Sequence, residues 1–347
     1  MPDAYDWPFS NHELPRLDLL GSNLYGASFY LIKLLPARFI LQTAHEEGRI
    51  TRGSHIVETS SGTFGLALAM LAAAKDYRLT LISDPAIDDR LNARLQDLGA
   101  RVEILRAPHP EGGYQRARLD RLQELRDEDP DAFWPNQYGN PDIPRSYDRV
   151  ADYLVQEIGH IDCLVGTVGT GGSMVGTAKS LRAHFPGMTA IGVDTGKSIL
   201  FGQHNGSRLL RGLGNSIMPS NLDHAVFDHV SWVPAGLAFN ATRQLHRTHG
   251  LYMGGTSGAA YMVARWWARQ HPDTTVVALF PDEGHRYADT IYNDQWLGMV
   301  PGAQDSLPNE PTPVHHPYDG EDIWSSFTWN RRSLQEVLSS PSLQEVN

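Results

Sequence analysis

The chain has 347 residues, 41% of them hydrophobic, and a net charge of −11. This length predicts about two domains with sizeable cores, and no apolar run approaches the roughly 20 residues that span a membrane. The acidic balance excludes nucleic acid as an expected partner, because binding to its phosphates needs clustered positive charge.

The N-terminal segment and the cysteine content predict a cytoplasmic protein. Residues 1–20 contain four acids and no apolar core of the kind that a signal peptide carries. The single cysteine, Cys163, excludes an internal disulfide and is typical of a reducing compartment. It lies in an apolar run, where an inert core thiol is expected. The histidines show no tight ligand spacing, so no metal is predicted.

From residue 55 onward, short apolar strands alternate with longer helical patterns. In a first series, each predicted strand is followed by a helix: 55–58 by 62–74, 78–83 by 87–98, 101–105 by 115–126, and 133–137 by 147–158. A second series has strands at 163–168, 189–194, 230–234 and 274–281, again with helices between them. This alternation predicts βαβ units with mainly parallel sheets covered on both faces.

The predicted fold class is therefore α/β, with two three-layer domains and a cleft between them. The boundaries are 1–145 for the N-terminal domain and 146–300 for the C-terminal domain. Residues 301–347 form a proline-rich tail. Its prolines are expected to break any regular element, so this tail is predicted to be a linker or a surface strap.

Lysine is scarce, which narrows the search for amine chemistry. Of 29 basic residues, only Lys33, Lys75, Lys179 and Lys197 are lysines. Arginine cannot replace lysine as an amine nucleophile, because its guanidinium stays protonated. Lys33 stands among Leu31, Ile32, Leu34 and Leu35, which argues against a surface position.

Two strand-to-helix loops are suited to anions. In the first, which covers 58–65, hydroxyls and backbone N–H groups could hold a carboxylate, although a serine-rich helix cap is the better explanation for such a loop on its own. The second, Gly169–Ser173, precedes a helix and is suited to phosphate. It lacks the third glycine of a dinucleotide fingerprint, since Met174 stands there, but Asp194 lies at a plausible ribose-binding distance. Alone, this loop leaves nucleotide and small-phosphate readings open.

A third loop, residues 253–260, precedes an apolar helix, and its Thr256 hydroxyl could contact a ring nitrogen or cap that helix. Other motifs are the ungapped run from Lys33 to Gly48, then Gln137–Pro141 (Gln-Tyr-Gly-Asn-Pro), and Gly212-Leu-Gly214. Together with the loops, these motifs resemble fold-type II pyridoxal-phosphate enzymes, in particular the cysteine synthase family. The resemblance covers roughly residues 25–297.

The resemblance implies a cofactor, pyridoxal 5'-phosphate, and a role for each matching residue. Lys33 would hold the cofactor as an imine and then act as the base that removes the substrate's α-proton. Cofactor-binding residues would be Gly169, Thr170, Gly171, Gly172, Ser173, Thr256 and Thr63. Substrate-binding residues would be Ser60, Ser61, Gly62, Phe64, Gln137 and Gly212.

The implied reaction is β-replacement on O-phosphoserine or O-acetylserine through an aminoacrylate. An amine or thiol nucleophile would then give cysteine or a diaminopropionate-type amino acid. Ile32–Ala37 and Pro281–Trp296 look most like the aminocarboxyethyl-glutamate synthases, which replace the phosphate of O-phosphoserine with an amine. The resemblance also implies a homodimer whose only other partner is a small amino-acid substrate.

Departures from the family pattern leave the substrate open. Thr63 replaces the family asparagine that contacts the cofactor's phenolic oxygen, and Phe64 replaces the next threonine. One alternative function is a β-elimination lyase or dehydratase that releases a keto acid and ammonia. Another is a nucleotide-binding oxidoreductase that uses Gly169–Ser173 and Asp194.

Overall fold

A computed structural model describes residues 7–111, 113–304, 306–320 and 322–339. The chain forms two compact units, of which unit 1 comprises Met1–Glu13 and Leu31–Ser146, and unit 2 comprises Leu14–Tyr30 and Tyr147–Asn347. The sequence assigns residues 14–30 to the N-terminal domain and separates 301–347 as a tail, whereas both segments belong to unit 2. Residues 1–6 of the segment searched for a signal peptide, and 340–347 of the tail, lie outside the described residues.

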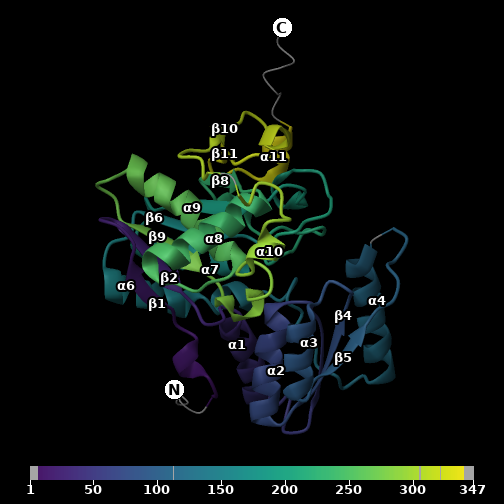
Figure 1. The fold of residues 1–347 in the computed structure, drawn as a ribbon. Coiled ribbons are helices and arrows are strands. Elements are labelled where there is room, and N and C mark those ends of the chain that lie inside the picture. The colour runs from purple at the N-terminus through teal and green to yellow at the C-terminus, as the bar shows by residue number, and fades with distance from the viewer. Residues whose placement is uncertain (1–6, 112, 305, 321, 340–347) are drawn as a thin grey trace. The chain divides into compact units, whose positions relative to one another are not determined.

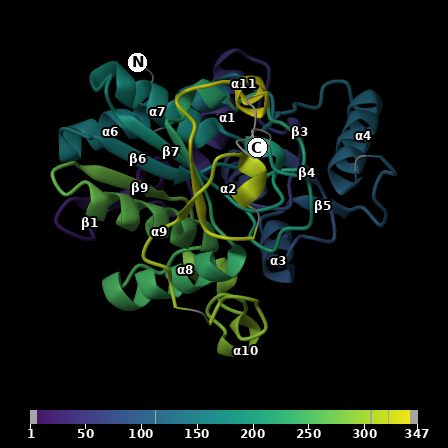
Figure 2. The ribbon, with the colours of Figure 1, turned by 90° about the horizontal axis from the view of Figure 1, so that it is seen from above.

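Unit 1 is built on a three-stranded parallel sheet in the order β3-β4-β5, with α2 and α3 on one side and α4 on the other (Figures 1 and 2). Its strands are β3 (His55–Thr59), β4 (Arg78–Ser83) and β5 (Arg101–Ile104). Its helices are α1 (Leu34–Glu46), α2 (Thr63–Lys75), α3 (Asp89–Asp97), α4 (Gly113–Glu128) and α5 (Asp142–Arg145), with the 3-10 turn η2 (Ser10–His12) before them.

The sequence of α2 explains its place in unit 1. Residues 64–72 are all buried, so this helix is apolar around most of its circumference. It ends where Asp76 adopts a left-handed conformation (φ 57°) and the chain turns into β4. Because α2 is fixed by burial along its length, its first turn holds the 59–65 loop at the carboxyl end of β3.

Unit 2 contains an eight-stranded sheet in the order β1-β2-β9-β6-β7-β8-β11-β10. Its strands are β1 (Arg16–Leu19), β2 (Leu24–Ser28), β6 (Cys163–Thr167), β7 (Thr189–Asp194), β8 (His229–Trp232), β9 (Val276–Phe280), β10 (Thr312–Pro313) and β11 (Ser325–Thr328). Its helices are α6 (Asp148–Ile158), α7 (Gly172–His184), α8 (Ala235–His249), α9 (Gly255–Gln270), α10 (Asp294–Leu297) and α11 (Leu334–Leu338). The 3-10 turns are η3 (Ile199–Phe201), η4 (His224–Val226), η5 (Gly284–Tyr287) and η6 (Pro317–Gly320).

Helices cover both faces of the unit 2 sheet. α6 and α7 lie on one face, and α9 lies on the other with α8 packed on its outer side (Figure 2). The core between α9 and the sheet is apolar, with Val165, Val276 and Ala278 facing Ala260 and Ala264 in one cluster. The central strands β2, β9, β6, β7 and β8 are parallel, as the sequence predicts for strands covered on both faces.

The proline-rich segment is part of the sheet, contrary to the expectation that it contains no regular element. β11 pairs antiparallel with β8, and β10 pairs with β11. Pro313 is tolerated because β10 is the edge strand, where a missing N–H costs no ladder bond on the open side. Trp324 and Trp329 are 4% and 0% exposed, so hydrophobic burial anchors this segment on unit 2.

One predicted strand is wrong. Residues 133–137 form a loop, in which Phe133 makes an isolated bridge with Ile56. Asn136 adopts a left-handed conformation (φ 54°), which ends any extended run before Gln137.

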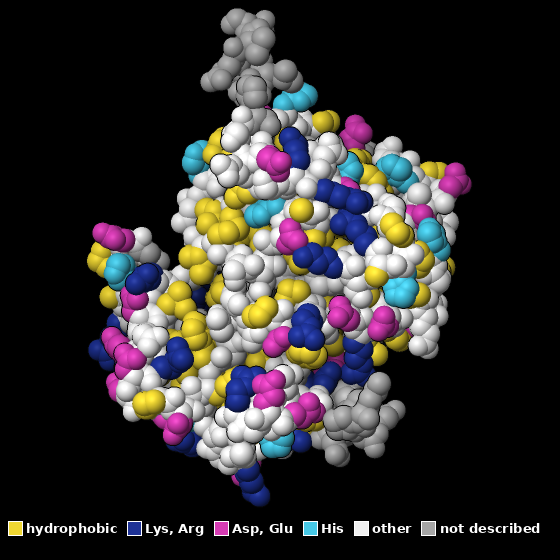
Figure 3. Space-filling model, turned by 180° about the vertical axis from the view of Figure 1, so that it is seen from behind, with side chains coloured by type: hydrophobic (Ala, Val, Ile, Leu, Met, Phe, Trp, Pro, Cys, Tyr) yellow, Lys and Arg dark blue, Asp and Glu magenta, His cyan; other side chains and the backbone are white. Residues whose placement is uncertain are grey.

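The described surface carries mixed charges. On the face shown in Figure 3, acidic and basic side chains lie among histidines and scattered hydrophobic residues. None of the helices within the described ranges has the length and apolar character needed to cross a bilayer.

Candidate active site

Lys33 immediately precedes α1, at the point where the chain enters unit 1. It is the N-cap residue of that helix, and its neighbours Ile32 and Leu34 are buried. Burial lowers the pKa of Lys33 from 10.5 to about 8. A substantial share of its amine is therefore neutral near physiological pH, as a nucleophile or base requires.

The other lysines have different surroundings. The Lys75 ammonium lies 4.5 Å from the ring centre of Trp7, a cation–π contact. Lys179 forms an exposed ion pair with Asp223 (2.7 Å), and Lys197 lies 3.8 Å from Asp322. These contacts give each of the three a partner in its own unit.

The 59–65 loop of unit 1 leads into α2, whose N-cap residue is Gly62. The Ser60 hydroxyl accepts from the N–H groups of Gly62 (3.2 Å) and Gly65 (3.0 Å) and so satisfies a donor in the first turn of the helix. Within the described residues, the N–H groups of Thr63 and Phe64 have no hydrogen-bond partner. Such donors at a helix start suit a carboxylate. The Phe64 ring is only 1% exposed and is packed in the interior.

A buried carboxylate, which the sequence did not single out, fixes the position of Gln137. Glu58, at the end of β3, is 0% exposed. It accepts from Gln137 N–H (3.1 Å), from the Trp134 indole (3.1 Å) and from Thr59 N–H (2.6 Å). Burial raises the pKa of Glu58 to about 7, although these donors oppose the shift. Glu58 thus ties the 59–65 loop to the 133–137 loop.

A buried arginine from α4 reaches the same loop. Arg118 is 5% exposed and lies 3.3 Å from the Asp84 carboxylate, and it donates to the Ser61 hydroxyl (3.4 Å). Its Nε has no partner within the described residues. An arginine in a helical run reads as a surface residue in the sequence, so only the fold reveals its burial.

The Gly169–Ser173 loop of unit 2 is shaped by close backbone contacts. A Cβ on Gly169 would lie 2.9 Å from the Gly212 carbonyl oxygen. A Cβ on Gly171 would lie 2.8 Å from Leu222 Cα, and Gly171 has φ 84°, a conformation that favours glycine. The N–H groups of Gly171, Gly172 and Ser173 have no partner in the described chain. They leave several donors at the start of α7 for an anion.

Thr256 lies beside this loop, in the first turn of α9. A Cβ on Gly212 would lie 3.0 Å from the Thr256 methyl group, so Gly169, Gly212 and Thr256 form a contiguous set in unit 2. Thr256 is 4% exposed, and its hydroxyl has no hydrogen-bond partner among the described residues. The neighbouring Ser257 hydroxyl is also buried without a hydrogen-bond partner among the described residues, and the sequence did not indicate Ser257 as a site residue. Orphaned buried hydroxyls are rare and suggest a missing ligand.

Asp194, from the oxidoreductase alternative, and Cys163, the expected core thiol, both lie in the interior. Asp194 is 0% exposed, and burial raises its pKa to about 7. One of its carboxylate oxygens accepts from Thr195 N–H, and a Cβ on Gly214 would lie 3.2 Å from that same oxygen. Cys163 is buried in β6, and burial raises the pKa of its thiol. In the described part of the chain, no three His, Cys, Asp or Glu side chains are grouped as metal ligands.

A family model described as "Pyridoxal-phosphate dependent enzyme" matches residues 27–282. The chain belongs to this family. An N-(2-amino-2-carboxyethyl)-L-glutamate synthase from Cupriavidus metallidurans is 37% identical over 80% of this chain and 83% of its own. A synthase of the same name from Ralstonia nicotianae is 36% identical, over 78% and 80%. The crystal structure of a cysteine synthase from Entamoeba histolytica has the same fold, with a TM-score of 0.73, 23% identity, and coverage of 82% of this chain and 84% of that one.

The pyridoxal-phosphate family assignment confirms the resemblance seen in the sequence and makes pyridoxal phosphate the cofactor of this enzyme. The unit 2 residues fit that group on their own geometry. The close packing of Gly169 and Gly171 and the unpaired N–H groups of Gly171, Gly172 and Ser173 suit its phosphate, and the Thr256 hydroxyl suits a ring nitrogen. The nucleotide-binding oxidoreductase is thereby overturned, and Asp194 is an interior residue beside the Gly212–Gly214 segment.

Proposed function

We propose that the enzyme catalyses β-replacement, in which an amine displaces the leaving group on the β-carbon of an activated serine. Two relatives at 37% and 36% identity are named for an aminocarboxyethyl group attached to glutamate, which supports an amine nucleophile. The observation that carries the proposal is the Thr256 hydroxyl, a neutral buried group without a partner in the described chain. A neutral hydroxyl beside the cofactor's ring nitrogen leaves that nitrogen unprotonated. The ring then withdraws less negative charge from the substrate's α-carbon, which favours loss of the β-substituent and its replacement.

Pyridoxal phosphate, when bound, stabilises negative charge at the substrate's α-carbon. In this proposal, Lys33 would hold the cofactor, and its amine would take the substrate's α-proton and return it to the α-carbon after the new bond has formed. Gly169–Ser173 hold the phosphate, with the backbone N–H groups as the main donors. Thr256 contacts the ring nitrogen, and Thr63 contacts the phenolic oxygen. Gly212 closes the site beside Gly169, as its packing supports.

The 59–65 loop and Gln137 are proposed to bind the substrate's carboxylate. The N–H groups of Thr63 and Phe64, which have no partner in the described chain, support this role. Ser61 and Gly62 would contribute as members of the same loop, in which the Ser60 hydroxyl already accepts from Gly62 and Gly65. Phe64 contributes its amide, since its ring is packed in the interior. Glu58 keeps the Gln137 backbone in place for the same task.

Phosphate is the proposed leaving group. Arg118 is buried beside Ser61 with an Nε that lacks a partner in the described chain, so it offers a donor to an anionic substituent. The C–O bond to phosphate breaks, inorganic phosphate leaves, and the amine forms a C–N bond as it loses a proton. Acetate, which carries less charge, would use this arginine less.

The test offers O-phosphoserine and O-acetylserine with glutamate or sulfide, and identifies products by mass spectrometry. We expect an aminocarboxyethyl adduct of an amine and faster turnover with O-phosphoserine. Arg118→Lys should reduce the preference for O-phosphoserine, while Arg116→Gln, which breaks an exposed pair on the same helix, should leave it unchanged. Pyruvate and ammonia without an adduct would show the lyase alternative instead.

Lys33 has its own test, which is borohydride reduction of the loaded enzyme followed by peptide mapping. A pyridoxyl group on Lys33 is expected, and one on Lys75, Lys179 or Lys197 would contradict the assignment. We also propose a homodimer, as the family resemblance implies, and a cytoplasmic location, as the single cysteine suggests. Light scattering and cell fractionation check these two properties.

A further inference from the structure

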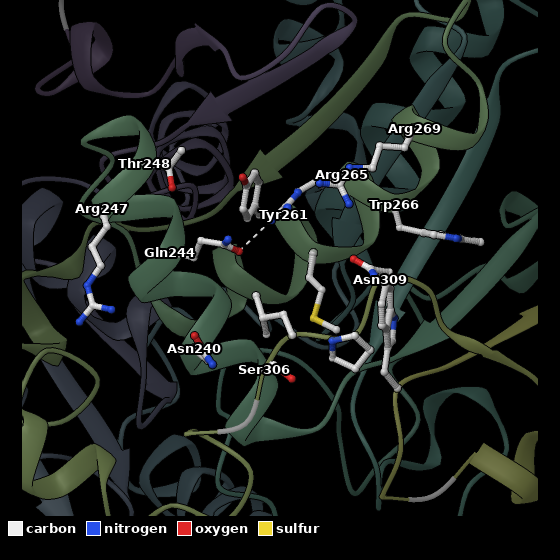
Figure 4. A pocket seen from close by; sticks show the side chains of 14 residues that line it. Asn240, Gln244, Arg247, Thr248, Tyr261, Arg265, Trp266, Arg269, Ser306 and Asn309 are labelled. Atoms are coloured by element: carbon white, nitrogen blue, oxygen red, sulfur yellow. Dashed lines mark hydrogen bonds between the residues drawn. The ribbon is translucent and has the colours of Figure 1, made fainter.

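Unit 2 contains a cavity that the proposed reaction does not use. It has a volume of about 420 Å³ and lies between α8, α9 and the segment 306–309 (Figure 4). Three arginines line it: Arg247 from α8, and Arg265 and Arg269 from α9. Gln244 and Arg247 are three residues apart on α8, and Arg265 and Arg269 are four apart on α9. Each pair therefore shares one face of its helix.

The described side chains that line this cavity carry only positive charge, on an otherwise acidic protein. The chain has 40 acidic and 29 basic residues, yet no acid occurs between Asp228 and Asp273. None of the cavity's described lining residues is acidic. Four arginines occur in that interval, and Arg243 is paired with Asp294 (2.7 Å).

The three arginines of the cavity have no carboxylate partner among the described residues. Arg265 donates to the neutral Gln244 side chain (2.8 Å), a bond visible in Figure 4, and its guanidinium lies 6.0 Å from the Tyr261 ring centre. Neither contact compensates its charge. Guanidinium groups that line one cavity with no acidic side chain among its described lining residues are suited to an external anion.

We propose that this cavity binds a small organic anion with two or more carboxylate or phosphate groups. The arginines match the planar oxygen pairs of either group. The Gln244 amide nitrogen offers a donor to a polar atom, and Met262 and Trp266 offer apolar surface for a carbon skeleton. The volume falls in the range of about 300–1,000 Å³ that is typical of small-molecule sites.

The cavity is a different site from the predicted cofactor pocket. Thr256 is in the first turn of α9, and Arg265 follows nine residues later, or about 14 Å along the helix axis. A bound anion would contact the same helix that carries Thr256, but not its first turn.

The experiment is calorimetric titration of the full-length, cofactor-loaded protein with tricarballylate and, separately, with inorganic pyrophosphate. At least one probe should bind, and the tighter one identifies the preferred group. In Arg265→Gln/Arg269→Gln, the affinity should fall at least about tenfold. Arg243→Gln is the matched control, because Arg243 also lies on α8 but is already paired with Asp294. It should bind like the wild type.

Other variants separate this site from the catalytic one. Gln137→Ala, in the predicted substrate loop, should leave the affinity for the probe unchanged. Thermal melting and cofactor absorbance check the fold, and Arg247→Gln replaces the double variant if that does not fold. The proposal is overturned if neither probe binds below about 10 mM. It is also overturned if the double variant binds the probe as tightly as the wild type, or if Arg243→Gln or Gln137→Ala loses as much affinity as the double variant. A loss of affinity that occurs only because an oligomer dissociates overturns it as well.

Discussion

The two strand-to-helix loops of the predicted site reach similar forms by different means. The Gly169–Ser173 loop of unit 2 is fixed by backbone packing, since Gly169 and Gly171 leave no room for a Cβ. The 59–65 loop of unit 1 is fixed by side chains, because the Ser60 hydroxyl accepts from Gly62 and Gly65 and Glu58 joins the loop to Gln137. One loop therefore depends on the absence of side chains and the other on their hydrogen bonds.

The difference fits the ligands proposed for the two loops. A phosphate on a permanent cofactor can be held by amides alone, and close glycine packing brings these amides to it. An amino-acid substrate must be admitted and released at every turnover, and a loop braced by a buried network keeps its donors aligned in between. Substitutions in the two loops should therefore affect cofactor retention and substrate affinity separately.

The largest effect is expected from Gly171→Val. Valine would be strained at φ 84° and would collide with the Leu222 backbone, 2.8 Å from its Cβ. The loop must then move and lose about two charge-assisted hydrogen bonds to phosphate, which corresponds to a loss of about a thousandfold in cofactor affinity. Equilibrium dialysis of pyridoxal phosphate measures it.

Gly187→Val is the matched control for that experiment. A Cβ at Gly187 meets nothing within 4 Å, and the residue lies in the same unit, between α7 and β7. Its cofactor affinity should equal that of the wild type. Full cofactor occupancy in Gly171→Val at low cofactor concentration would show that the phosphate is bound elsewhere.

The same contrast explains what the sequence could and could not predict. The glycine loop was predictable, because glycines between a buried strand and a helix are a local pattern. The parallel sheets followed from the alternation of elements. Glu58, Trp134 and Gln137 come from positions up to 79 residues apart, so no local pattern joins them. The strand β11 was missed for a related reason. The prolines before it indicate an irregular segment, and its pairing partner β8 is too distant in the sequence for a local pattern to reveal the pair.

Lys33 gives a pH-dependent test of unit 1. Its pKa is lowered from 10.5 to about 8, so the neutral amine predominates above pH 8. At pH 8 the neutral fraction should exceed that of an ordinary lysine by about a hundredfold. The rate of cofactor capture by the cofactor-free protein should rise up to about pH 8 and level off above it. A rate that still rises at pH 10, as with Nα-acetyl-lysine, would contradict the lowered pKa.

Glu58→Gln tests whether the substrate loop depends on the buried carboxylate. The carboxylate accepts with both oxygens, from Gln137, Trp134 and Thr59. The glutamine amide has one oxygen, so its NH2 group must face at least one of these N–H donors and leave that donor unpaired. An unpaired buried donor costs about 2 kcal/mol, and if the loop loses that much stability in its binding conformation, the substrate KM should rise about thirtyfold. Cofactor retention should not change. Glu103→Gln, which loses a surface pair with Arg121, controls for charge in unit 1, and equal KM increases in both variants would rule out a specific role.

The smallest effect concerns Thr63, where the family has asparagine. An asparagine amide reaches further than a threonine hydroxyl and can bond both the cofactor's phenolic oxygen and a substrate carboxylate. Thr63→Asn should therefore speed cysteine formation from O-acetylserine and sulfide, which we expect to be slow in the wild type. One added hydrogen bond of about 1 kcal/mol corresponds to a gain of about fivefold in kcat/KM. Thr51→Asn, at an exposed position in unit 1, should give no gain. If the wild type already makes cysteine rapidly, Thr63 does not set the choice of substrate, and the braced loop around Glu58 holds the carboxylate without help from this position.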